Sequence, residues 1–203
     1  MPQTNKELIE LLKTRGVLKS RAIEKAMLAC PREYFVPKDY LDEAYGNYPL
    51  PLGEGQTISQ PLTVIFILEL LEVKAGQKVL EVGFGSGWQT AMLSFLVGQK
   101  GRVFAFEIKK GVASLGKANL TPIIRIAGVE NTTLFQESYT PKFKEFAPYD
   151  RIISGAAFSK IPQDLIATLA PNGRLVAPTQ ENDIRVISKT GKGNIREQII
   201  PGF

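Results

Sequence analysis

The sequence predicts an α/β fold, a Rossmann-like doubly wound sheet of mainly parallel strands with helices on its faces. Two observations carry this prediction. Strand patterns alternate with helix patterns through most of the 203 residues. Residues 77–107 also follow the order strand, glycine turn, helix, strand and acid, which is typical of a nucleotide-binding half-unit. We expect residues 62–203 to form the core of a single unit, with residues 1–61 packed on it.

Two short amphipathic helices are predicted at the start of the chain. Thr4 and Glu7 have the spacing of a capping box before an apolar helical face, and Gly16 is a suitable stop. A second helix should run from Ser20 to about Ala29. Such helices cannot bury their apolar faces alone, so they should pack on the core as a small N-terminal extension.

Residues 30–61 contain five prolines and several aromatic residues, which predicts an irregular arm. The aromatic content argues against disorder. The arm either packs over the sheet or forms a lid or substrate cleft, and the two interpretations are compatible. From spacing alone, Ser59 is the N-cap of a helix over residues 62–71, with Pro61 in its first turn.

The central half-unit predicts a ligand site. An apolar strand over residues 79–82 leads into Gly83, Gly85 and Gly87, and a second strand over 102–106 ends at Glu107. Glycines let the backbone approach a ligand closely, and a carboxylate at the end of the neighbouring strand can bind both ribose hydroxyls. Position 88 holds tryptophan where a dinucleotide site needs its third glycine. The GxGxG pattern preceded by Glu81 instead resembles class I methyltransferases, which bind S-adenosylmethionine.

The second half of the chain continues the alternation of strands and helices. Residues 121–127 fit either a helix or a strand because Pro122 interrupts the pattern. The remaining predicted elements are a helix over 109–119, strands over 132–135 and 149–154, a helix over 162–169, a strand over 173–176, and a closing hairpin over 183–188 and 195–200.

Composition limits the chemistry of the chain. Histidine is absent and Cys30 is the single cysteine, so we expect no disulfide and no metal. A reaction must then use carboxylates, hydroxyls, backbone groups or a cofactor. The net charge of +5 is scattered without a run of five like charges, so nucleic acid is not an expected partner. No apolar stretch is long enough for a membrane span or a signal peptide, and we expect a cytoplasmic protein without membrane contact.

Several segments resemble one family, that of protein-L-isoaspartate O-methyltransferases. The resemblance spans about residues 20–190 and rests on MLACPREYFVP, AYGNYPLPLGEGQTISQP, VLEVGFGSGWQTA, YDRIISGAA with Ile161-Pro162 following, and PNGRLVAP. It implies the class I S-adenosylmethionine-dependent methyltransferase fold with a seven-stranded sheet. It also implies S-adenosyl-L-methionine as cofactor and isoaspartyl-containing proteins and peptides as substrates. We expect a monomer.

The resemblance also assigns the site residues. Ser59 becomes the catalytic hydroxyl, which positions the reacting carboxylate by a hydrogen bond. The implied cofactor-binding residues are Thr57, Ile58, Ser59, Glu81, Gly83, Phe84, Gly85, Ser86, Gly87, Glu107, Ile108, Glu137 and Ser138. The implied substrate-binding residues are Gly155, Ala156, Ala157, Ile161 and Pro162.

One departure from the family pattern keeps alternatives open. The family has Gly-Asp-Gly where this chain has Glu137-Ser138-Tyr139, so Ser138 replaces the aspartate expected at the adenine end. A related carboxyl methyltransferase that acts on another peptide aspartate is therefore the first alternative. An RNA methyltransferase is a weaker one, because the chain lacks the Asn/Asp-Pro-Pro-aromatic motif. A binding protein without catalysis is disfavoured by the intact Ser59, Glu107 and loop glycines.

Overall fold

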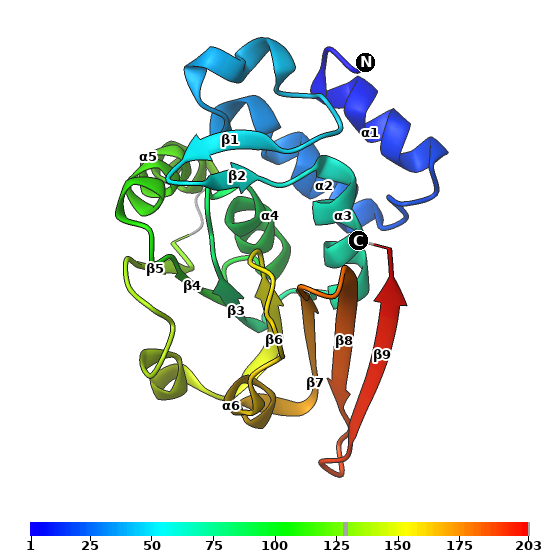
Figure 1. Ribbon diagram of the computed structural model, residues 1–203, viewed down its shortest axis with the longest axis vertical. Coiled ribbons are helices and arrows are strands. Elements are labelled where there is room, and N and C mark those ends of the chain that lie inside the picture. The colour runs from blue at the N-terminus through cyan, green and yellow to red at the C-terminus, as the bar shows by residue number, and fades with distance from the viewer. Residues whose placement is uncertain (128–129, 203) are drawn as a thin grey trace.

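The computed structural model describes residues 1–127 and 130–202. Within them lies a seven-stranded sheet of α/β type, as the sequence predicts (Figure 1). Five strands are parallel, and β8 runs antiparallel to both of its neighbours. The strand order is β5 (Thr132–Phe135), β4 (Arg102–Phe106), β3 (Lys78–Val82), β6 (Tyr149–Ser154), β7 (Leu169–Pro178), β8 (Asp183–Lys189) and β9 (Ile195–Pro201).

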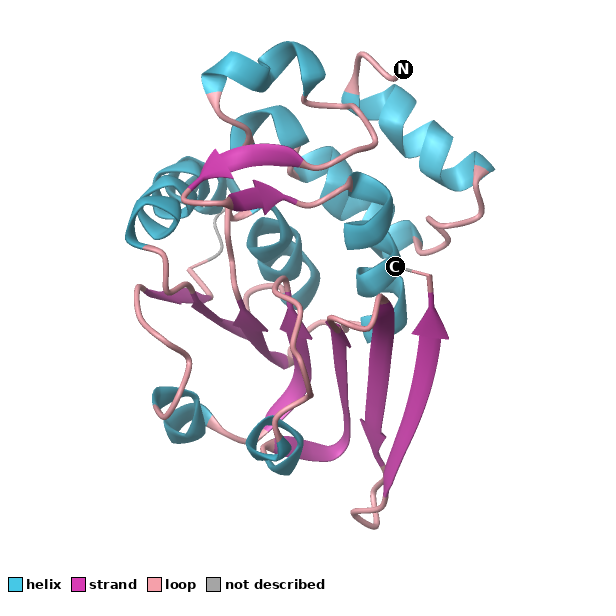
Figure 2. Ribbon diagram, in the orientation of Figure 1, coloured by secondary structure: helices cyan, strands magenta, loops and turns pink. Residues whose placement is uncertain are grey.

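Both faces of the sheet are covered at its central strands β3 and β6, whose successive side chains point to opposite faces and so enter two separate cores. Val79 of β3 joins the core that contains the helices α3 (Pro61–Leu71) and α4 (Trp88–Val97). Leu80 joins a second core with Phe143 of η3 (Lys142–Phe146) and Leu165 of α6 (Gln163–Ala167). Figure 2 shows these helices on the two sides of the sheet. The long helix α5 (Lys110–Ala127) follows β4, so the ambiguous residues 121–127 are helical.

The N-terminal helices α1 (Asn5–Thr14) and α2 (Arg21–Ala29) are placed as predicted. The Thr4 hydroxyl accepts a hydrogen bond from the Glu7 N–H (3.2 Å), while Glu7 reaches back one residue further than expected, to the Gln3 N–H (2.7 Å). The buried faces of both helices belong to the same core as α3 and α4. The extension is therefore packed onto the main sheet.

The prediction of an irregular arm over residues 30–61 is partly wrong. The structure has two short 3₁₀ helices, η1 (Arg32–Phe35) and η2 (Lys38–Glu43), and then an antiparallel hairpin of β1 (Leu50–Gly53) and β2 (Gln56–Ile58). Positive φ angles at residues 53–55 make the turn, which the sequence Gly-Glu-Gly permits. The strands are short and β1 contains a proline, so their pattern is weak.

The expectation that Ser59 caps α3 is also wrong. The N-cap is Gln60, whose side chain makes no capping bond. The Leu62 N–H instead donates to Asn47 Oδ1 at 3.0 Å. An asparagine from the preceding loop therefore satisfies the helix start, and the Ser59 hydroxyl is not used there.

The C-terminal elements differ from prediction in their lengths. The helix expected over 162–169 is confined to α6, and β7 begins earlier than the expected residue 173 because Leu169 already pairs with Tyr149. The closing hairpin of β8 and β9 is confirmed. No helix among the described residues is long and apolar enough to cross a membrane.

Candidate active site

A cavity of about 380 Å³ lies at the carboxyl ends of β3, β4 and β6. In the sheet, β4 lies on one side of β3 and β6 lies on the other, so the strand order reverses at β3. The carboxyl end of β3 is therefore the topological switch point, where open α/β sheets bind ligands. Figure 1 shows the hairpin β1–β2 at this end of the strands. Most predicted site residues line the cavity: Thr57, Ile58, Ser59, Gly83, Phe84, Gly85, Ser86, Glu107, Ile108, Glu137, Ser138, Gly155, Ala156 and Ala157.

The glycine loop after β3 is held in a shape that side chains would disturb. Gly83 and Gly85 have positive φ angles of 78° and 54°, which favour glycine. A Cβ atom on Gly116 of α5 would lie 2.3 Å from the Gly85 carbonyl oxygen, so α5 presses directly on the loop. The loop is a tight backbone cradle that opens into the cavity.

Gly87 does not line the cavity, although it belongs to the predicted motif. Its φ angle is 87°, and a Cβ atom there would lie 2.6 Å from Leu120 Cγ. Gly87 therefore lets α4 start beside α5, which is a packing role.

Glu107 is fixed by two backbone donors at the end of β4. One carboxylate oxygen accepts from the Gly85 N–H (3.1 Å), and the other accepts from the Lys109 N–H (3.0 Å). The side chain is only 7% exposed. Each oxygen keeps a free lone pair, so the carboxylate can accept two hydroxyl donors from a ligand such as a ribose.

Glu81 lies behind the cavity wall and not in it. Its side chain is 0% exposed, and Oε1 accepts a hydrogen bond from Gln89 Nε2 at 2.9 Å. Gln89 itself lines the cavity. Burial raises the pKa of Glu81 to about 7, and the nearby charge of Glu107 acts in the same direction. Gln89 therefore links Glu81 to the cavity by a hydrogen bond.

The segment after β6 forms a wall of the cavity next to Gly83. Gly155 donates its N–H to the Val82 carbonyl (2.8 Å), and a Cβ atom on Gly155 would lie 2.6 Å from the Gly83 carbonyl oxygen. Ile161 and Pro162, predicted for this wall, do not line the cavity. Ile161 is packed in the second core, and Pro162 is the N-cap of α6.

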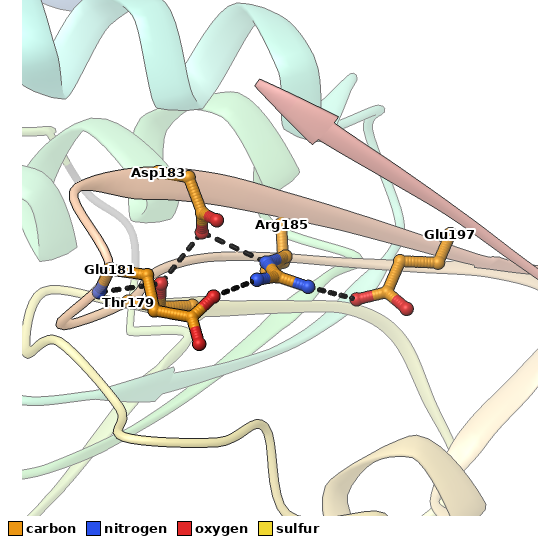
Figure 3. Close-up of polar contacts among 5 residues, drawn as sticks. All are labelled: Thr179, Glu181, Asp183, Arg185 and Glu197. Atoms are coloured by element: carbon orange, nitrogen blue, oxygen red, sulfur yellow. Dashed lines mark hydrogen bonds and ion pairs between the residues drawn. The ribbon is translucent and has the colours of Figure 1, made fainter. Parts of the chain in front are cut away.

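A polar network behind this wall supports Phe158, which lines the cavity. The Phe158 N–H donates to Pro178, and Gln180 donates back to Phe158 (3.1 and 3.0 Å). Figure 3 shows the adjoining turn, in which Asp183 accepts from the Thr179 hydroxyl (2.6 Å) and from Arg185 Nε (2.9 Å). Arg185 also pairs with Glu181 and Glu197. This network keeps the β7–β8 turn in place against the wall.

Several lining residues were missed by sequence reasoning. Most of them are sequence neighbours of predicted site residues, and this adjacency in the sequence is the signal that could have identified them. They are Gln56, Val64, Val82, Trp88, Gln89, Phe106, Lys109, Tyr139 and Phe158.

Comparison with known proteins decides the family. The sequence model of the protein-L-isoaspartate(D-aspartate) O-methyltransferase family matches residues 3–200. The chain belongs to this family. Protein-L-isoaspartate O-methyltransferases from Ignicoccus hospitalis and Methanospirillum hungatei are 35% and 41% identical to it. Those alignments cover 99% and 88% of this chain and 95% and 79% of the relatives.

Solved structures agree with the fold. A crystal structure from Plasmodium falciparum, provisionally assigned as a protein-L-isoaspartate O-methyltransferase and bound to S-adenosyl-L-homocysteine, has a TM-score of 0.85. It is 24% identical, and the match covers 100% of this chain and 96% of that one. The sequence-based expectations of family and fold class are thus confirmed.

Proposed function

We propose that the protein transfers a methyl group from S-adenosyl-L-methionine to the free carboxylate of isoaspartyl residues in damaged proteins and peptides. One observation carries the proposal. In a chain of this family, a fixed carboxylate (Glu107), a glycine cradle and the Ser59 residue face a common cavity at the switch point of the sheet. The bound cofactor supplies a methyl group on a sulfonium, which a carboxylate can attack directly.

The residues present fit this cofactor. Glu107 has two oxygens that can accept ribose hydroxyls, and Gly83 and Gly85 offer backbone that no Cβ shields. Thr57, Ile58, Phe84, Ser86 and Ile108 would complete the binding surface, with Glu137 and Ser138 at the adenine end. Gly87 and Glu81 would act indirectly, the first through packing and the second through Gln89.

The chain needs no general base for this reaction, which suits its lack of histidine. The substrate α-carboxylate is ionised at about pH 7 because its ordinary pKa is near 3.5. The Ser59 hydroxyl would donate a hydrogen bond to one carboxylate oxygen and keep its proton. Gly155, Ala156 and Ala157 would hold the peptide, while Ile161 and Pro162 would support that wall from behind. Catalysis would come mostly from orientation, because a correctly held nucleophile removes much of the entropic barrier.

Ser138 supports a second candidate, a carboxyl methyltransferase that acts on a different peptide aspartate. Ser138 lines the cavity, and it stands where the family resemblance implies an aspartate. In this second candidate, the change alters cofactor affinity and substrate choice. In either case we expect the protein to act in the cytoplasm as a monomer and without nucleic acid. The net charge of +5 gives RNA methylation only weak support.

A matched pair of peptides separates the candidates. One peptide carries an isoaspartyl residue and the other carries aspartate at the same position, and both are offered with methyl-labelled cofactor. Base-labile labelling of the isoaspartyl peptide alone is the expected result. Labelling of the aspartyl peptide alone would favour the second candidate and contradict the proposal, as would labelling of neither peptide by a protein that binds the cofactor.

A further inference from the structure

The guanidinium group of Arg32 is buried, and its hydrogen bonds to the described residues all go to backbone carbonyl groups. Its side chain is 0% exposed. Nη1 donates to the carbonyl oxygens of Ala44 (2.7 Å) and Gly46 (3.4 Å), and Nη2 donates to those of Tyr48 (3.2 Å) and Ser59 (3.2 Å). Within residues 1–127 and 130–202, no carboxylate forms an ion pair with it.

The four carbonyl groups flank the hairpin β1–β2. Three of them precede β1, and the fourth, that of Ser59, directly follows β2. Arg32 therefore joins the two ends of the hairpin at its base. The tip is held separately, since Glu54 accepts from the Gly111 N–H at the start of α5 (2.8 Å). The hairpin is thus fixed at both ends beside the glycine loop, where a Cβ atom on Gly85 would lie 3.8 Å from Leu52 Cδ1.

Arg32 also fixes a second wall residue, Trp88. The guanidinium carbon lies 5.6 Å from the centroid of the indole ring, in cation–π range. The indole N–H donates to the Cys30 carbonyl at 2.9 Å, which sets the direction of the ring. Trp88 begins α4 immediately after the glycine loop. The Arg32 side chain therefore contacts both Ser59 and α4, the helix that follows the glycine loop.

Stability alone is a poor explanation for this arrangement. Arg32 Nε is buried and has no hydrogen-bond partner in the described part of the chain. A buried cation without a counter-charge is costly. Burial lowers the pKa of Arg32 to about 10, which still leaves the group charged near neutral pH. An apolar residue would fill the same space without this cost, but it could not hold four carbonyl groups in a fixed arrangement.

We propose that Arg32 is a positioning residue, which holds Ser59 and Trp88 in the geometry that the cavity requires. The geometric half of this proposal is that Arg32 fixes the positions of Ser59 and Trp88. The catalytic half, that turnover depends on those positions, rests on the proposed function. Loss of the fixed carbonyl groups would let the Ser59 backbone move, and its hydroxyl would lose its orientation toward the substrate. Cofactor affinity, which depends mainly on Glu107 and the cradle, would change less.

The test compares Arg32→Lys with Arg151→Lys. Arg151 is a matched control because it is also buried (7% exposed) and donates to backbone carbonyl groups of Glu72, Asp150 and Asn172. It lies in β6, near the amino ends of the strands and away from the cavity. Both lysine variants keep the charge but lose the fork of donors, so a general loss of stability should be similar in the two.

Two readouts do not depend on activity. Hydrogen exchange of the amides of residues 56–60 should be about tenfold faster in Arg32→Lys and unchanged in Arg151→Lys, since only the former frees the hairpin base. The emission of Trp88, the only tryptophan, should shift in Arg32→Lys alone. With the isoaspartyl peptide, kcat should fall about tenfold or more in Arg32→Lys, with S-adenosyl-L-homocysteine affinity within about twofold.

Unchanged exchange at residues 56–60 in Arg32→Lys would overturn the proposal. So would equal losses of kcat in the two variants, which would mark a general effect of instability. An inactive wild-type protein with faster exchange in Arg32→Lys would contradict the proposed function and support the geometric half. Should Arg32→Lys not fold, NMR of the wild-type protein decides. Slowly exchanging guanidinium protons with NOE contacts to the Trp88 ring support the proposal, and rapid exchange without those contacts refutes it.

Discussion

At the scale of single residues, Glu107 and Glu81 show how position separates two carboxylates. Glu107 lines the cavity and accepts from two backbone N–H groups, whereas Glu81 is sealed behind Gln89. The sequence motif contains both acids and gives them the same expected role. Their different surroundings lead to different predictions, one for ligand binding and one for stability.

Glu107→Ala should weaken binding of S-adenosyl-L-homocysteine by about 1–3 kcal/mol, because the ribose hydroxyls would lose their acceptors. Isothermal titration calorimetry measures this directly. Glu69→Ala is a suitable control, since Glu69 also accepts from backbone N–H groups, those of Lys19 and Ser20, but does not line the cavity. Equal affinity of Glu107→Ala and wild type would remove Glu107 from the binding site.

Glu81→Gln should make the protein more stable than wild type at neutral and alkaline pH. The folded pKa of about 7 lies above the ordinary value of 4.5, so the folded state holds a proton that the unfolded state loses in this window. Wild-type stability should therefore fall by about 3 kcal/mol as pH rises from about 4.5 to about 7. Denaturant unfolding at several pH values measures the slope. An identical slope in Glu81→Gln would show that another group titrates.

Ser59→Ala should lower kcat about 10- to 100-fold, from loss of one hydrogen bond to a charged group, while cofactor affinity stays within about twofold. Ser138→Ala, at the proposed adenine end of the cavity, should show the reverse pattern of weaker cofactor binding and retained kcat. Steady-state kinetics and calorimetry on both variants separate the two effects. Unchanged turnover in Ser59→Ala would contradict the role assigned to Ser59.

At the scale of elements, the site depends on close packing of α4 and α5 around the glycine loop. Gly87 and Gly116 let these helices approach the loop and each other. The hairpin β1–β2 adds a cover from the N-terminal region. Each contact joins elements that are distant in sequence, so the cavity is a product of packing and not of the motif alone.

Gly87→Ala should destabilise the protein by about 2–4 kcal/mol, since it combines a positive φ angle with a Cβ atom 2.6 Å from Leu120 Cγ. Gly16→Ala isolates the first effect, because Gly16 ends α1 in a Schellman motif, with a φ angle of 68° and no atom of the described residues within 4 Å of the added Cβ. That variant should cost only about 1–2 kcal/mol. Thermal unfolding of both variants is the measurement. Equal costs would show that α5 moves aside freely.

Elements with a strong local sequence pattern are predicted correctly, and elements with a weak pattern are not. The strands β3, β4 and β6 are short apolar runs next to turns or glycines, and they occur where predicted. The hairpin β1–β2 is not predicted because its strands have only four and three residues, and β1 contains a proline. The prediction that Ser59 caps α3 is wrong because the acceptor for the Leu62 N–H is Asn47, which lies 15 residues away in the sequence.

At the scale of the whole molecule, the parallel order of β3, β4 and β6 brings the predicted residues to one end of the sheet. Strand order and the glycine motif were sufficient to expect a ligand there. The role of Arg32 could not be predicted, because its acceptors are 12 to 27 residues distant and are carbonyl groups without a side-chain signature. We retain as a proposal the division into an N-terminal part, residues 1–61, and a core, residues 62–203.

Titration of the wild-type protein with S-adenosyl-L-homocysteine, followed by calorimetry and by Trp88 emission, tests the central claim most directly. The account predicts saturable binding of one molecule per chain, a change in Trp88 emission because that ring lines the cavity, and no competition by NAD. Absence of binding by both methods, or displacement by NAD at equal concentration, would contradict it.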